Sequence, residues 1–187
     1  MKWVIITAAV LGLAAGLQCG ISTKGVNAAG LPCKYRAGRA LPDSRCSPGS
    51  TDPAVKQTVE DSYIQARTAA ARAIVCAPGR AARVRPPSSY TQPLKLVLMR
   101  RYGSVGSPAQ YQLDHLIPLE LGGAPRDISN LWPQPIGYAH TKDTVENALH
   151  RLVCDGVISL WVARGLIAID WRAAGALAAL EIGRAHV

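Results

Sequence analysis

YQLDHLIPLELGGAPRDISNLWP, residues 111–133, is the stretch that decides how we expect this chain to fold. A strand-like run over residues 110–121 ends at a Gly-Gly pair, and residues 129–132 form a short return strand. Because Asp114 and His115 are adjacent, a strand directs their side chains to opposite faces, where each can take a different role. The stretch therefore predicts a hairpin that carries one carboxylate and one imidazole.

Helical patterns lie on both sides of this hairpin. A Thr-Asp-Pro start followed by Ala-rich sequence predicts one long helix or two short ones over residues 51–75. A further helix is expected over residues 91–102, with inward apolar side chains and outward cations: Leu94, Val97 and Leu98 inward, Lys95, Arg100 and Arg101 outward. Apolar periodicity predicts three more helices, over residues 141–154, 159–171 and 172–180. The expected fold class is α+β.

Both ends of the chain stand apart from the expected single domain, residues 51–180. Residues 1–28 have a basic start and an apolar run too short to span a membrane, which is typical of a signal peptide. Residues 29–50 are rich in Gly, Pro, Ser and Cys, which indicates an irregular arm. Residues 182–187, IGRAHV, are similar to the translation of a sequencing adapter, so we leave His186 out of every site.

Cysteine usage agrees with an exported protein. Removal of a signal peptide that includes Cys19 leaves four cysteines, which allow three disulfide connectivities. We favour Cys33 with Cys46 and Cys76 with Cys154. No two cysteines have the CxxC spacing of a zinc knuckle. The expected location is secreted or periplasmic, with no stable membrane span after processing.

The net charge of +9 is unevenly distributed along the chain. No acidic residue lies between Asp61 and Asp114, whereas eight cationic residues do: Arg67, Arg72, Arg80, Arg83, Arg85, Lys95, Arg100 and Arg101. A nucleic-acid backbone is the usual partner of such a segment, because phosphate contacts supply most of the sequence-independent affinity. Charge alone leaves a solubilising surface or attraction to an acidic cell envelope as alternatives.

The pattern DHxxPLxxGG, followed by Asn-Leu and a Lys that enters a helix, resembles that of HNH endonucleases. A closer resemblance is to exported bacterial HNH-type proteins, through DHLIPLELGG, NLWPQP and KDxxENxLHxxVC, and it extends upstream through LPDSRCSPG and RPPSSYTQPLK. The resemblance implies a ββα-metal fold, in which two strands and a helix hold one divalent cation against a scissile phosphate. The chain departs from better-known HNH enzymes in lacking the two CxxC pairs that hold a structural zinc.

The resemblance also implies a role for each site residue. His115 is expected to be the general base, Asn130 to orient it by a hydrogen bond across the hairpin, and Asp114 and His140 to be metal ligands. Lys142 and Arg126 are candidate phosphate-binding residues. We expect Asp143 and Glu146 to form a helix-capping box, His150 to be a surface or pairing residue and Trp132 to belong to the core.

These expectations together predict an exported HNH-type endonuclease that hydrolyses phosphodiester bonds with little sequence preference, acting on DNA. Mg²⁺ is the expected cation, and Mn²⁺, Ni²⁺ or Zn²⁺ would also suit a site that contains histidine. A non-catalytic nucleic-acid- or envelope-binding protein that retains the fold is one alternative. An exported nuclease toxin, which differs only in its target, is another.

Overall fold

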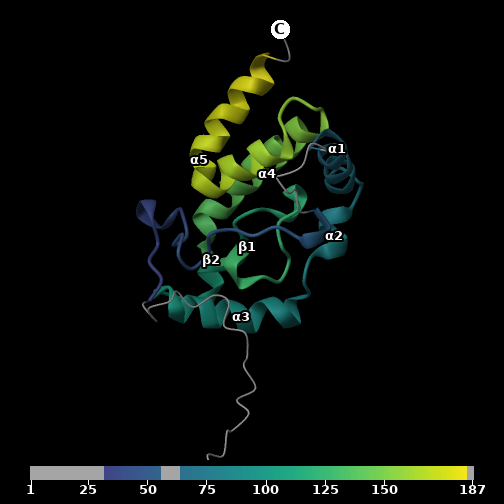
Figure 1. The fold of residues 1–187 in the computed structure, drawn as a ribbon. Coiled ribbons are helices and arrows are strands. Elements are labelled where there is room, and N and C mark those ends of the chain that lie inside the picture. The colour runs from purple at the N-terminus through teal and green to yellow at the C-terminus, as the bar shows by residue number, and fades with distance from the viewer. Residues whose placement is uncertain (1–31, 56–63, 185–187) are drawn as a thin grey trace, which may run out of the picture.

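The computed structural model describes residues 32–55 and 64–184 (Figure 1). The predicted signal peptide lies outside the described residues, as do residues 56–63 of the first predicted helical stretch and the last three residues of the adapter-like tail. The described part is mixed α and β, with a single two-stranded antiparallel sheet and several helices among its residues, which confirms the predicted α+β class.

The sheet is a hairpin of β1 (Tyr111–His115) and β2 (Leu131–Pro135), in which Asp114 lies opposite Trp132 and His115 opposite Leu131. The predicted first strand, residues 110–121, extends six residues beyond the observed end at His115. The chain leaves the strand after His115 and forms a 3₁₀ turn at Leu119–Leu121. The return strand begins two residues later than predicted and contains two prolines, which a strand paired on one side tolerates.

Helices surround the hairpin. Their bounds are Ile64–Val75 for α1, Arg80–Val84 for α2, Ser88–Arg101 for α3, Ile136–Cys154 for α4 and Leu160–Arg184 for α5. Figure 1 shows α3 along one side of the hairpin and the α4 and α5 pair on the other. The backbone of Asp170 is extended, with φ −159°, and divides α5 into two helical segments. This break confirms the two C-terminal helices that the sequence predicted.

The inward face of α3 differs from the predicted one. Leu98 is buried as expected, but Val97 is 49% exposed and the cationic Lys95 is buried. The Lys95 ammonium donates to the backbone carbonyls of Pro108, at 3.0 Å, and Tyr111, at 3.1 Å. Periodicity could not reveal this, because Lys95 turns inward to bind the chain that leads into β1.

The core has two parts. A larger apolar cluster joins α1, α4 and α5, with Val75, Leu149 and Ile167 among its buried members. A smaller cluster packs Trp132 and Tyr102 against the N-terminal arm. Trp132 is fully buried, which confirms its predicted place in the core.

The two predicted disulfides are confirmed. Cys33 bonds to Cys46 within the N-terminal arm, and Cys76, just after α1, bonds to Cys154 at the end of α4. Disulfides of this kind persist in oxidising compartments. None of the helices in the described ranges has the length and apolar character needed to cross a membrane.

Candidate functional site

A pocket of about 330 Å³ opens at the end of β1, beside α4. Four carboxylate residues, one imidazole and one guanidinium line it, among other side chains: Asp114, Glu120, Asp143, Glu146, His115 and Arg85. The strand end supplies Asp114 and His115, and the middle of α4 supplies two of the acids. The pocket thus combines a proton acceptor, several anionic oxygens and one cation within a small volume.

The His115 ring is buried and its orientation is fixed by the hairpin loop. Its Nε2 lies 3.0 Å from the carbonyl oxygen of Pro125. A carbonyl can only accept a hydrogen bond, so Nε2 carries the proton in the neutral ring and Nδ1 keeps a free lone pair. Burial lowers the pKa of His115 below its ordinary value, against the opposing effects of the Pro125 carbonyl and the Asp114 charge. The ring is therefore a neutral base with one defined basic nitrogen.

Asn130 holds the loop that supplies this carbonyl. Its Nδ2 donates to the carbonyl oxygens of Ile117, at 2.9 Å, and Ala124, at 3.1 Å. Its Oδ1 accepts from the backbone N–H groups of Ile117, at 2.9 Å, and Ser50, at 3.3 Å. The predicted hydrogen bond from Asn130 to the His115 ring is thus replaced by an indirect link, in which Asn130 fixes the loop and the loop fixes the ring.

The Gly-Gly pair in this loop is required for two reasons. Gly122 has φ 74°, a left-handed conformation that favours glycine. A Cβ at Gly123 would clash with the backbone carbonyl of Ile117, so the loop closes only where this position has no side chain. The spacing of the motif therefore reflects backbone packing beside the pocket.

Two buried arginines support the same loop from outside. Arg164, on α5, donates from Nε to the Leu121 carbonyl at 2.7 Å and from Nη2 to the Val55 carbonyl at 3.1 Å. Arg80, on α2, donates to the Leu119 carbonyl at 2.9 Å and pairs with Asp52 at 2.8 Å. Arg80 belongs to the cationic segment that the sequence assigned to nucleic acid, so part of that charge serves the fold instead.

Lys142 does not occupy the surface position that a phosphate contact requires. Its side chain is fully buried, and its Nζ lies 2.8 Å from Asp114 Oδ2 and donates to the His115 backbone carbonyl at 2.8 Å. It also pairs with Glu146, one turn along α4. Burial would lower the pKa of Lys142, but Asp114 and Glu146 outweigh it and raise the pKa above its ordinary value. Lys142 is therefore a charged group buried behind the pocket, in contact with two of the carboxylates that line it.

The predicted capping box at Asp143 and Glu146 is wrong. The helix begins at Ile136, five residues before the predicted start, so both acids lie in its middle turns and face the pocket. Burial raises the pKa of Glu146 to about 7, against the lowering effect of Lys142. The sequence missed Glu146 as a site residue because a D-x-x-E pattern near a misplaced helix start has the appearance of a cap.

The predicted metal ligand His140 and the predicted phosphate-binding residue Arg126 lie outside this pocket. His140 is exposed and lines a separate hollow between α4 and α5, with Trp171 and Arg172, so the structure does not bring it together with Asp114. Arg126 is exposed, and its guanidinium lies 5.1 Å from the centre of the Tyr90 ring. Arg85 is the cation that lines the pocket, and no spacing in the sequence distinguished it from its neighbours.

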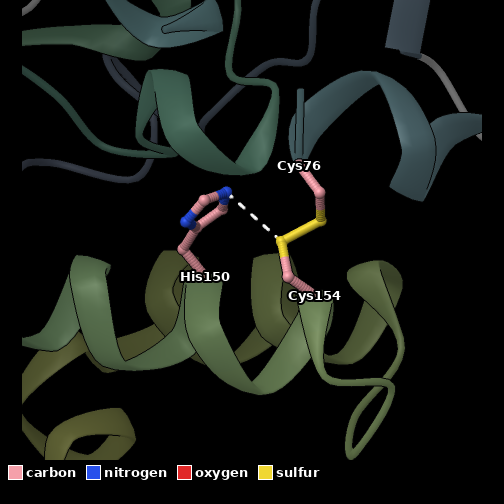
Figure 2. Close-up of side chains that lie close together, drawn as sticks. All are labelled: Cys76, His150 and Cys154. Carbon is pink, nitrogen blue, oxygen red and sulfur yellow. Dashed lines mark hydrogen bonds between the residues drawn. A yellow bond between two sulfur atoms is a disulfide. The ribbon is translucent and has the colours of Figure 1, made fainter. Parts of the chain in front are cut away.

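A second group of metal-binding residue types lies away from this pocket. Figure 2 shows Cys76, His150 and Cys154, whose potential ligand atoms all lie within 4.8 Å of one another. The two sulfurs are bonded to each other, and His150 Nε2 lies 3.4 Å from Cys154 Sγ and 3.1 Å from the Val75 carbonyl. His150 is thus a pairing residue, as the sequence predicted, and the bonded sulfurs are not available as thiolate ligands.

The acidic pocket also contains an unsatisfied carboxylate. Within the described part of the chain, Glu120 Oε2 is buried without a hydrogen-bond partner, whereas Asp114 Oδ2 accepts from Trp132 Nε1 at 3.1 Å as well as from Lys142. A buried carboxyl oxygen without a partner favours a cation or a hydrogen-bond donor beside it.

Neither a family model, nor a curated protein, nor a solved structure matches this chain.

Proposed function

We propose that this protein is a metal-dependent endonuclease of the HNH type that hydrolyses phosphodiester bonds of nucleic acid, with DNA as the expected substrate. The observation that carries the proposal is His115, a buried neutral imidazole held through Nε2 on Pro125, with Asp114 beside it in an acidic pocket. The order of a hairpin followed by α4 supports a ββα-metal unit, and export into an oxidising compartment is part of the same proposal.

His115 would act as the general base. Its Nδ1 takes a proton from the attacking water, while Nε2 stays bonded to the Pro125 carbonyl and keeps the ring in place. Arg85, at the wall of the pocket, would bind a phosphate oxygen through its guanidinium. Asn130 keeps the loop, and therefore the ring, in the orientation that proton transfer needs.

The pocket offers ligands for a divalent ion, but only one of the two predicted metal ligands, Asp114, is among them. Asp114 and His140 do not fit as a ligand pair, because they line different pockets. Asp114, Glu120 and Glu146 offer oxygen donors in one pocket, and the unpartnered Glu120 Oε2 favours a cation there. Mg²⁺ commonly keeps several waters and binds through one or two carboxylates, which suits this set. Such an ion would neutralise charge on the phosphate and stabilise the leaving oxygen.

Nicking of a supercoiled plasmid tests the proposal. The purified chain is expected to nick DNA in Mg²⁺ or Mn²⁺ and to lose this activity in a chelator. His115→Ala should lower the rate roughly 100-fold or more, because it removes the general base. His140→Ala is the matched control and should retain activity, since His140 is exposed outside the pocket. Nicking that is unchanged by the chelator, or that His115→Ala retains at the wild-type rate, would contradict the mechanism.

A non-catalytic nucleic-acid-binding protein is the second candidate. The Lys142 ammonium favours it, because this cation already lies between Asp114 and Glu146, where a nuclease would need anionic oxygens for a metal. This alternative predicts salt-sensitive DNA binding and no strand cleavage with any divalent ion. The plasmid assay, combined with a binding assay on the same protein, separates the two candidates.

A further inference from the structure

Lys142 is held from three sides. Its ammonium contacts carboxylate oxygens of Asp114 and Glu146 and the backbone carbonyl of His115. A lysine ammonium has three N–H donors and no acceptor, so these three partners satisfy it completely. Lys142 is also fully buried, so water does not compete for these contacts. The positive charge is therefore fixed directly behind two carboxylates that line the pocket.

This charge limits what the carboxylates can bind. Asp114 and Glu146 each have one oxygen committed to Lys142, and the same oxygen of Asp114 also accepts from Trp132. A metal site needs several ligand atoms close together. In the described parts of the chain, one group of three His, Cys, Asp or Glu residues has its ligand atoms within 4.8 Å of one another, and this group is Cys76, His150 and Cys154. The acids of the pocket thus do not converge on one point, and a divalent ion that enters meets a buried ammonium.

A phosphate group would supply what the protein lacks. Magnesium and manganese sites in phosphoryl-transfer enzymes combine one or two carboxylates with oxygens of the substrate. Arg85 lines the same pocket and offers a guanidinium to the phosphate, and Glu120 offers an oxygen that Lys142 does not bind. Substrate and ion together would bring both the missing ligands and the missing negative charge.

We propose that Lys142 prevents the pocket from binding a divalent ion by itself, so that the ion and a nucleic-acid phosphate bind together. This inference rests on the proposed nuclease function and adds that binding of the ion is coupled to binding of the substrate. The ion is not a resident cofactor of the free protein. Lys142 acts as a positioning residue, which holds Asp114 and Glu146 apart from the ion until the phosphate arrives.

Binding of Mn²⁺, followed by the electron paramagnetic resonance signal of the free ion, tests this inference. His115→Ala protein is used in every sample so that DNA is not cleaved, and a short DNA duplex alone gives the background. Mn²⁺ affinity should rise about tenfold or more when the duplex is present, within the usual range of coupling between two ligands. By thermodynamic reciprocity, Mn²⁺ should raise the affinity for the duplex by the same factor, measured by fluorescence anisotropy.

Replacement of the ammonium provides the second arm. Lys142→Met in the His115→Ala background should bind Mn²⁺ about tenfold more tightly without DNA, and the coupling to DNA should fall. Lys34→Met, which removes an exposed lysine of the N-terminal arm, is the matched control and should behave as the parent. Near-ultraviolet circular dichroism shows whether Lys142→Met folds. If it does not, the inference is decided by Mn²⁺ binding to the His115→Ala protein with and without the duplex.

The experiments distinguish failure of the inference about Lys142 from failure of the proposed nuclease function. If the His115→Ala protein binds Mn²⁺ equally well with and without the duplex, while wild-type protein nicks plasmid, the inference about Lys142 is overturned and the proposed function remains. If wild-type protein does not nick plasmid and Mn²⁺ does not bind in either condition, the proposed function fails, and the inference that depends on it fails as well.

Discussion

At the scale of single residues, Asn130 connects the hairpin loop to the imidazole. It is fully buried and uses all four of its hydrogen-bonding positions on backbone groups of Ser50, Ile117 and Ala124. Its side chain therefore replaces the strand pairing that ends at His115. The contact with Ala124 fixes the peptide next to Pro125, whose carbonyl orients the ring.

Asn130→Ala should destabilise the fold by about 3–5 kcal/mol, because it leaves several buried backbone groups without a partner at about 1–3 kcal/mol each. Urea unfolding, followed through the intrinsic tryptophan fluorescence of the chain, measures this change. Asn147→Ala, at an exposed position of α4, should change the stability by less than about 0.5 kcal/mol. Equal stabilities for the two variants would contradict the role of Asn130.

The residues that form the site could be identified from the motif, but only some of their roles could be predicted. Asp114 and His115 line one pocket at the end of β1, although their adjacency on a strand had predicted side chains on opposite faces. The contacts of Lys142 could not be predicted, since a lysine near a helix start is typically exposed. Its burial depends on two carboxylates, and Asp114, the one on the hairpin, lies 28 residues earlier in the chain.

At the scale of elements, the position of α4 determines which of its side chains face the hairpin. The sequence predicted a start at residue 141, and the helix begins at Ile136, directly after β2. The buried residues Val145, Leu149, Leu152 and Val153 were predicted correctly, because periodicity depends on spacing. The roles assigned to Asp143, Glu146 and His140 depended on the start of the helix, and that boundary has no strong signal in Pro-Gln-Pro-Ile-Gly.

The disulfide between Cys76 and Cys154 is expected to stabilise the packing of α1 on α4. It closes a loop of 78 residues, for which the loss of entropy in the unfolded chain corresponds to about 4 kcal/mol. Replacement of both cysteines by serine should lower the free energy of unfolding by about this amount, measured in urea under non-reducing conditions. A loss below about 1 kcal/mol would show that α1 and α4 associate without the cross-link.

At the scale of the whole molecule, the excess positive charge is divided between the fold and the surface. Arg80 and Lys95 are buried with carbonyl or carboxylate partners, whereas Arg85 and Arg100 are exposed. The sequence predicted a cationic segment correctly, but it could not separate structural cations from free ones. That division depends on contacts with η4 (Leu119–Leu121) and with the chain before β1, which are distant in sequence.

Salt dependence of DNA binding tests whether the exposed cations near the pocket contact phosphate. Arg85→Ala should weaken binding and make the slope of log affinity against log salt less steep by about one, since each phosphate contact contributes about 0.9. Filter binding or anisotropy at several salt concentrations measures the slope. Arg172→Ala, on α5 beside the hollow that contains His140, removes the same charge and should leave the slope unchanged.

The contact between Arg164 and the hairpin loop makes the loop depend on a helix that follows it in the chain. Arg164 lies 43 residues after Leu121, whose carbonyl it binds, and it also holds the Val55 carbonyl from the far end of the chain. A chain that has formed β1, β2 and α4 but not α5 therefore lacks this support. The loop beside the pocket therefore has its full set of contacts only when the first turns of α5 are packed against it, so a chain cut before α5 would lack a complete site.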